Sequence, residues 1–297
     1  PEQVASRMLA LGAVLERAQI ERDLAAKRIA PDKARAKVAA LTKWLEDEGI
    51  MDVATSLEQD LLSAEPGDWL EEDLDLAWVA TDALAMLLWA AGQAPLPAVD
   101  QPATVDAVLG RLPLEKPTAG FIEQMAVKPS EELERHRDLW ETYLWRCEQE
   151  SSARLALAGE DVEFEFDVES ILDELEKDGF DAKAAKSKGG QAGLTAEALR
   201  FLGRKAAAKL AATKLLTPVS GDFPFRGKAL SALDDEDLQA ATSMAHERHH
   251  ALDWVLNGGE WDDLEVDELS DEALEEGEDF DEEPIDEDYD DGSGEGG

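Results

Sequence analysis

The sequence has little of the chemistry that stabilises secreted proteins or builds common metal sites. Its 297 residues include a single cysteine, Cys147, and only four histidines. One cysteine excludes an intrachain disulfide, which fits a reducing compartment. Residues 1–14 lack the basic and then apolar pattern of a secretory signal. We therefore expect a cytoplasmic protein.

Long apolar runs are also absent. The most apolar stretch, residues 77–91, contains Asp82. It falls short of the ~20 apolar residues that a membrane-spanning helix needs. Its composition indicates a buried helix, and we expect no association with a membrane.

Basic residues are scarce, with 28 Lys and Arg against 69 Asp and Glu and a net charge of −41. From Glu260 to the last residue there are 21 acidic residues and no Lys or Arg, so residues 1–259 carry a net charge of −20. Such a charge repels nucleic-acid phosphates at long range. Binding of nucleic acid is therefore not expected, whereas a basic protein partner suits the charge.

Most of the chain shows the apolar spacing of three and four residues that is typical of amphipathic helices. This pattern predicts a mostly α fold, an irregular multi-helix globular domain with at most a few short strands. The predicted helices cover residues 4–18, 32–49, 52–62, 70–91, 130–158, 195 onward and 234–256.

Several segments break this pattern. Five prolines within residues 93–117 predict an irregular connector with a short helix near 104–112. Glycines and lysines predict a flexible basic loop at 181–193. Residues 162–168 alternate like a strand or form an acidic loop, and residues 221–228 indicate a short hairpin or tight turn. We expect one helical domain over 1–266.

The C-terminal residues 267–297 are acidic and low in complexity, with few large apolar side chains. They cannot bury enough apolar surface to offset the conformational entropy of the chain. We predict a disordered tail. It either serves solubility alone or folds back onto the basic stretch 183–214 as an electrostatic lid.

The sharpest motif is H-E-x-x-H at residues 246–250. On a helix, His246 and His250 lie one turn apart and can share a zinc ion, with Glu247 as the base that activates bound water. Against this, the two histidines point away from the predicted core face, and a third ligand is not clearly spaced. An incidental match on an amphipathic helix is the simpler interpretation, and it requires no cofactor.

Other segments resemble a known family. Residues 247–255 read E-R-H-H-A-L-D-W-V, and W-D-D follows at 261–263. This is similar to the E-R-H-x-A-L-N-W-L … W-D-D signature of domain-of-unknown-function family 4272, which is found mostly in bacteria. Residues 7–21, 78–97 and 221–228 resemble its opening helix, its tryptophan-rich stretch and its glycine-bounded turn. The resemblance extends over most of 1–266 and is densest at 247–263.

The resemblance implies no established activity. Asp253 stands where the family tends to have Asn and Asp82 where it tends to have Glu, and the acidic tail lies outside the family pattern. The signature does not require a histidine at 246, which weakens the zinc hypothesis. It implies that five residues form a fixed polar-aromatic cluster: Glu247, Arg248, His249, Trp254 and Asp262. Because Arg248 borders the core face, it needs a carboxylate partner.

Two functions follow as hypotheses. The first is a non-enzymatic interaction protein with an acidic surface that acts through a basic protein partner. The alternative is a zinc-dependent hydrolase that uses His246, Glu247 and His250.

Overall fold

The computed structural model describes residues 1–160 and 168–262, and within these ranges the chain is predominantly helical, which confirms the predicted fold class. The strand-like residues 162–167 and the predicted disordered tail lie outside the described residues. The α-helices are α1 (Glu2–Ala25), α2 (Pro31–Asp47), α3 (Ser56–Ser63), α4 (Glu71–Ala90), α5 (Val105–Leu109), α6 (Ala119–Glu123), α7 (Ser130–Ala158), α8 (Val168–Lys177), α9 (Ala182–Ala212) and α10 (Asp235–Asn257).

Three smaller features complete the described elements. A short 3₁₀ turn, η1 (Met51–Val53), lies between α2 and α3, and a second, η2 (Leu230–Ala232), precedes α10. A two-stranded antiparallel hairpin, β1 (Pro224–Phe225) and β2 (Lys228–Ala229), pairs Phe225 with Lys228. Among the described helices, none combines the length and apolar character needed to cross a membrane.

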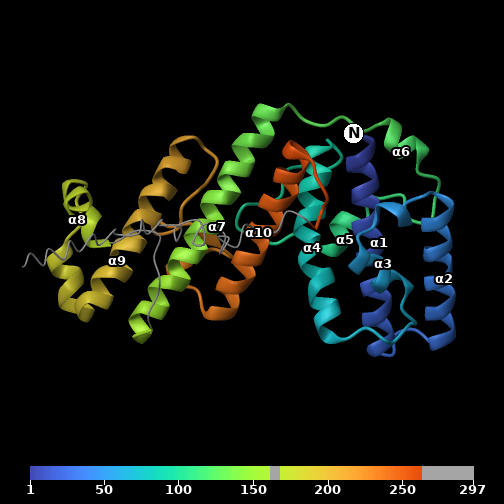
Figure 1. Ribbon diagram of the computed structural model, residues 1–297, viewed down its shortest axis with the longest axis horizontal. Helices are drawn as coiled ribbons and strands as arrows, with labels where there is room; N and C mark the ends of the chain where they lie inside the picture. The colour runs from blue at the N-terminus through green and yellow to red at the C-terminus, as the bar shows by residue number, and fades with distance from the viewer. Residues whose placement is uncertain (161–167, 263–297) are drawn as a thin grey trace, which may run out of the picture.

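The helices pack in a row that makes the molecule elongated (Figure 1). In the order of their contacts, α9 packs on α7, α7 on α10, α10 on α4, α4 on α1 and α1 on α2. Figure 1 shows α8 at one end of this row and α2 at the other. The central position of α10 gives its residues access to both the α7 side and the N-terminal helices.

The C-terminal half of helix α4 is deeply buried in this row. The predicted buried helix at 77–91 lies here, and the side chains from Ala83 to Ala91 are at most 5% exposed. Helix α10 is bounded as its sequence indicates. Asp234 accepts a hydrogen bond from the Asp237 backbone N–H at 2.8 Å, and Gly258 ends the helix with a φ of +71°.

Four arginines are at most 1% exposed: Arg7, Arg17, Arg146 and Arg248. Each of them pairs with a carboxylate. Arg146 on α7 donates to both carboxylate oxygens of Asp222, at 2.9 and 2.8 Å. Burial by itself would raise the pKa of Asp222, but the hydrogen bonds and charge of Arg146 outweigh it and the pKa is lowered. In the Arg146–Asp222 pair, the hydrogen bonds and the opposite charges therefore compensate the cost of burying the cation.

The prediction of a flexible loop at 181–193 is wrong. Residues 182–193 belong to α9, and Asp181 caps the helix by accepting a hydrogen bond from the Ala184 N–H at 2.9 Å. Only Gly189 and Gly190 leave the helical conformation, with a φ of +63° at Gly190. The alanines and lysines on both sides favour helix strongly enough that the glycines produce a kink instead of a loop. The connector 93–117, by contrast, is irregular apart from α5, as its prolines predict.

Cys147 is buried on α7, and burial raises the pKa of its thiol to about 12. It is therefore a small packing side chain at neutral pH rather than a nucleophile.

A close approach between α9 and α7 gives the first testable prediction. A β-carbon at Gly203 would collide with the Arg146 side chain, whereas at Gly120 on α6 it would meet nothing within 4 Å. We expect Gly203→Ala to destabilise the protein by about 1–3 kcal/mol through overpacking. Gly120→Ala is the matched control and should not destabilise it. Urea unfolding measures both, and equal stabilities of the two variants would contradict this packing.

Candidate functional site

Residues 246–250 lie around the circumference of α10, so their side chains enter different surroundings. Successive helical residues differ by about 100°. Arg248 points into the core, whereas Glu247 lines a cavity beside α3 and α4. His249 lies on another side of the helix, where Asp253 and Arg137 act on its charge. Glu247, Arg248 and His249 therefore do not share one site.

Arg248 is the most completely engaged residue of the signature. Its Nε and Nη2 donate to Asp82 Oδ1 on α4 at 2.8 and 2.6 Å. Its Nη1 and Nη2 donate to the carbonyls of Ala98 and Gln101 at 2.8 and 2.7 Å. The guanidinium also lies 4.6 Å from the ring centroid of Trp140. Asp82 supplies the carboxylate that a buried guanidinium requires. Through the Ala98 and Gln101 carbonyls, Arg248 also fixes the connector 93–117.

Asp82 is a strongly buried acid in this network. Burial raises its pKa above the ordinary value, and the charge of Arg248 and a 3.0 Å hydrogen bond from the Ala103 N–H oppose that shift.

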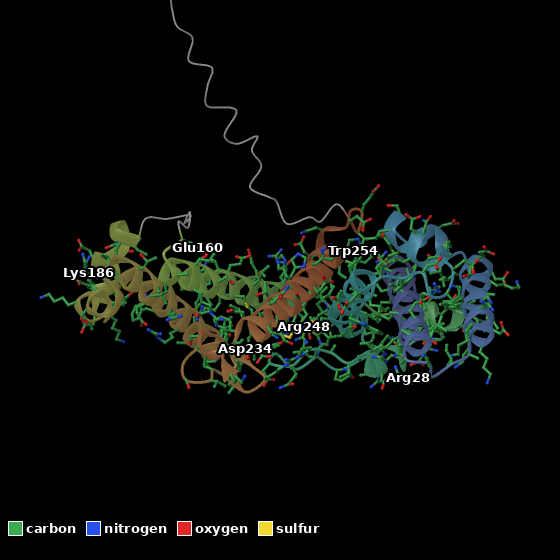
Figure 2. The ribbon with its side chains drawn as sticks, turned by 90° about the horizontal axis from the view of Figure 1, so that it is seen from below. Arg28, Glu160, Lys186, Asp234, Arg248 and Trp254 are labelled. Atoms are coloured by element: carbon green, nitrogen blue, oxygen red, sulfur yellow. The ribbon has the colours of Figure 1, made fainter. Side chains whose placement is uncertain are left out.

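Figure 2 shows Arg248 in the middle of α10, and Trp254 near the end of α10 that faces the N-terminal helices.

Two tryptophans organise that end of α10. Trp254 donates its indole N–H to the Gly259 carbonyl at 3.1 Å, and the Trp254 and Trp261 rings make an edge contact at 5.3 Å. The Arg7 guanidinium lies 4.5 Å from the Trp261 ring centroid and is paired with Glu58 on α3. These contacts hold the chain after α10 against α1 and α3.

A cavity of about 450 Å³ opens where these elements meet. We call it the acidic cleft. Its lining combines three exposed carboxylates with two indole rings: Asp52, Glu260, Asp262, Trp254 and Trp261. Among the described residues that line it, Arg7 is the one cation, and Glu58 balances its charge. Among the described residues, the cleft therefore carries a net negative charge.

A second cavity of about 140 Å³ adjoins the acidic cleft, and we call it the leucine groove. The two cavities share Thr55, Trp261 and Asp262. The groove is mainly apolar, and Glu247 lines it as well. Two of its side chains are unusually open to solvent, with Leu57 49% and Leu76 45% exposed.

Sequence reasoning missed most of this surface. Only Glu247, Trp254 and Asp262 had been singled out as site residues. Asp52, Leu57 and Leu76 lie on segments that carry ordinary helical patterns, and nothing in their local sequence marks them. The usable signal was the W-D-D motif at 261–263, which placed an aromatic ring and acids at the end of the folded body.

The histidines of the H-E-x-x-H motif contact each other and their neighbours. The His246 and His250 rings stack with centroids 6.2 Å apart, and His250 makes an edge contact with Trp261 at 4.4 Å. The hydrogen bond to Glu247 raises the pKa of His246, and burial lowers that of His249. Within residues 1–160 and 168–262, no group of three or more His, Cys, Asp or Glu side chains is placed to hold a metal ion. The zinc hypothesis therefore stays a prediction from sequence.

A family model described as "Domain of unknown function (DUF4272)" matches residues 1–165, which is more than half of the chain. The match includes α1 to α7 and does not reach α10. The resemblance expected at 247–263 lies outside the matched residues and stays a prediction from sequence. No curated protein and no solved structure matches the chain.

The Arg248–Asp82 pair gives the second prediction. Asp82→Ala leaves a buried guanidinium without its carboxylate, and we expect a loss of about 3–5 kcal/mol in the free energy of unfolding. The double variant Asp82→Leu/Arg248→Met removes both charges. It should be more stable than Asp82→Ala, because neither charge is then left buried without its partner. Urea denaturation of the three proteins tests this. A double variant less stable than Asp82→Ala would show that the pair is not the stabilising unit.

The zinc hypothesis gives the third testable prediction. If His246 and His250 bind zinc, protein expressed with ample metal should hold close to one equivalent by elemental analysis, and His246→Ala should lose it. Less than roughly a tenth of an equivalent in the unmodified protein would end the hypothesis.

Proposed function

The chain belongs to the domain-of-unknown-function family DUF4272, and we propose that it is a non-enzymatic interaction protein whose acidic cleft and leucine groove bind a basic amphipathic segment of a partner protein. The observation that carries the proposal is the acidic cleft, whose lining includes three exposed carboxylates and two tryptophans.

The acidic cleft has the chemistry that receives a Lys or Arg side chain. The exposed carboxylates attract the cation, and the Trp261 ring, which Arg7 covers on one face, adds an apolar wall for the stem of the incoming side chain. Its volume of about 450 Å³ falls within the usual range for ligand sites, roughly 300–1,000 Å³. Because Arg7 is paired with Glu58, it does not cancel the attraction of Asp52 and Asp262.

The leucine groove supplies the apolar half of the surface. Contiguous exposed apolar side chains on a protein surface mark interaction sites. Leu57 on α3 and Leu76 on α4 are each nearly half exposed above a floor that includes Leu11 and Leu61. Grooves of this kind accept the apolar face of an amphipathic helix. Because the groove shares Asp262 and Trp261 with the acidic cleft, one segment can occupy both.

The charge of the whole chain supports the same class of partner. A net charge of −41 steers basic proteins toward the surface and raises their association rate at low ionic strength. We also propose a cytoplasmic location, which the single buried cysteine supports.

Binding of a designed helical peptide of lysines and leucines is the fourth prediction. The peptide should quench or shift tryptophan fluorescence and bind less tightly as salt is raised. Asp52→Asn with Asp262→Asn should weaken binding about tenfold and reduce its salt dependence. Leu57→Ser with Leu76→Ser should weaken it by a similar factor without changing the salt dependence.

Matched controls come from the far part of the molecule. Glu174→Gln with Glu176→Gln removes two exposed charges from α8 (Figure 1), and Leu155→Ser with Leu157→Ser replaces two leucines of α7 that are 42% and 49% exposed. Both controls should bind the peptide like the unmodified protein. If they weaken binding as much as the cleft and groove variants, attraction is unspecific and the proposal fails.

A further inference from the structure

A separate cavity lies beneath the proline-rich connector, away from the residues of the acidic cleft. It has a volume of about 210 Å³ and is bounded by α4, the connector and α5. Its walls are mostly apolar, with Ala85 and Leu88 from α4, Val108 from α5, and prolines from the connector: Pro95, Pro97 and Pro102. We call it the proline pocket.

The proline pocket is apolar because its polar backbone groups are used elsewhere. The carbonyls of Ala98 and Gln101 accept hydrogen bonds from Arg248, and the Ala103 N–H donates to Asp82. The Asp100 carbonyl accepts from the Arg226 N–H at 2.8 Å. Proline has no N–H to satisfy. The connector is thus fixed by the buried ion pair. Binding of a ligand therefore costs little conformational entropy, because the connector is already ordered.

One cation lies at the edge of this pocket. Arg111 is exposed and lines the pocket together with the polar side chains of Gln101 and Thr104. Among the arginines of the described ranges, Arg111 and Arg135 are the two whose guanidinium forms neither an ion pair nor a contact over an aromatic ring. Arg111 is the one of these two that lines an apolar pocket, so its guanidinium is placed to bind the carboxylate of a ligand in that pocket.

From this arrangement we propose that the proline pocket binds a small apolar carboxylate, such as a medium-chain fatty acid. The hydrocarbon body fills the space between Leu88, Val108 and the prolines, and the carboxylate accepts two parallel hydrogen bonds from Arg111. The volume of about 210 Å³ lies below the usual range of roughly 300–1,000 Å³ for ligand sites, so the ligand is small. Gln101 and Thr104 provide further donors at the carboxylate end.

Calorimetry with octanoate on the full chain tests the proposal, with octan-1-ol as the uncharged probe of equal length. Octanoate should bind at one site and raise the Tm. We expect octan-1-ol to bind at least tenfold more weakly, and Arg111→Gln to weaken octanoate by about tenfold, because hydrogen bonds to charged groups contribute that much. Arg135→Gln is the matched control and should bind octanoate unchanged.

A second variant locates the site. Ala107 is exposed and lines the pocket, so Ala107→Phe should fill its mouth and abolish octanoate binding while far-UV circular dichroism stays unchanged. Binding of the lysine–leucine peptide should persist in both pocket variants. Octanoate binding that survives Ala107→Phe, or that is equal in Arg111→Gln and Arg135→Gln, would overturn the proposal.

Discussion

The buried pair of Arg248 and Asp82 is the interaction on which the rest of the arrangement depends. It joins α10 to α4 across the middle of the helical row, between residues that lie 166 positions apart in the sequence. The same guanidinium holds two carbonyls of the connector and lies over Trp140 of α7. A buried arginine that lacked the Asp82 carboxylate would carry an uncompensated charge, and one that lacked the carbonyls would have unsatisfied donors. The pair therefore selects one relative placement of α4, α7, α10 and the connector.

Both surfaces that we interpret as binding sites follow from this placement. On one side of α10, Glu247 and the chain after Trp254 meet α1, α3 and α4, and the acidic cleft and the leucine groove form there. On the other side, the connector is held over α4 and α5 and encloses the proline pocket. Neighbouring residues, Glu247 and Arg248, thus serve a solvent-facing cavity and the core, because they project about 100° apart on one helix.

The local sequence was a good guide to the elements and a poor one to their assembly. The apolar spacing predicted a helix over 130–158, and α7 has the same bounds. The short hairpin or tight turn at 221–228 and the helix over 234–256 were also anticipated. The loop predicted at 181–193 failed because two glycines were given more weight than the alanines and lysines around them. Of the site, the sequence indicated Glu247, Trp254 and Asp262, but not the acids and leucines of η1, α3 and α4 that complete it.

The sequence by itself determined the helical content, the excess of negative charge, the absence of disulfides and the need of Arg248 for a carboxylate. These properties depend on composition or on neighbours within one or two helical turns, which periodicity reports directly. Only the tertiary structure decided that Asp82 is that carboxylate, that His249 is separated from Glu247, and that Asp52, Leu57 and Leu76 share a surface with Trp261. Such pairings depend on which helix faces pack together, and a helical pattern fixes the direction of a side chain without naming what it meets.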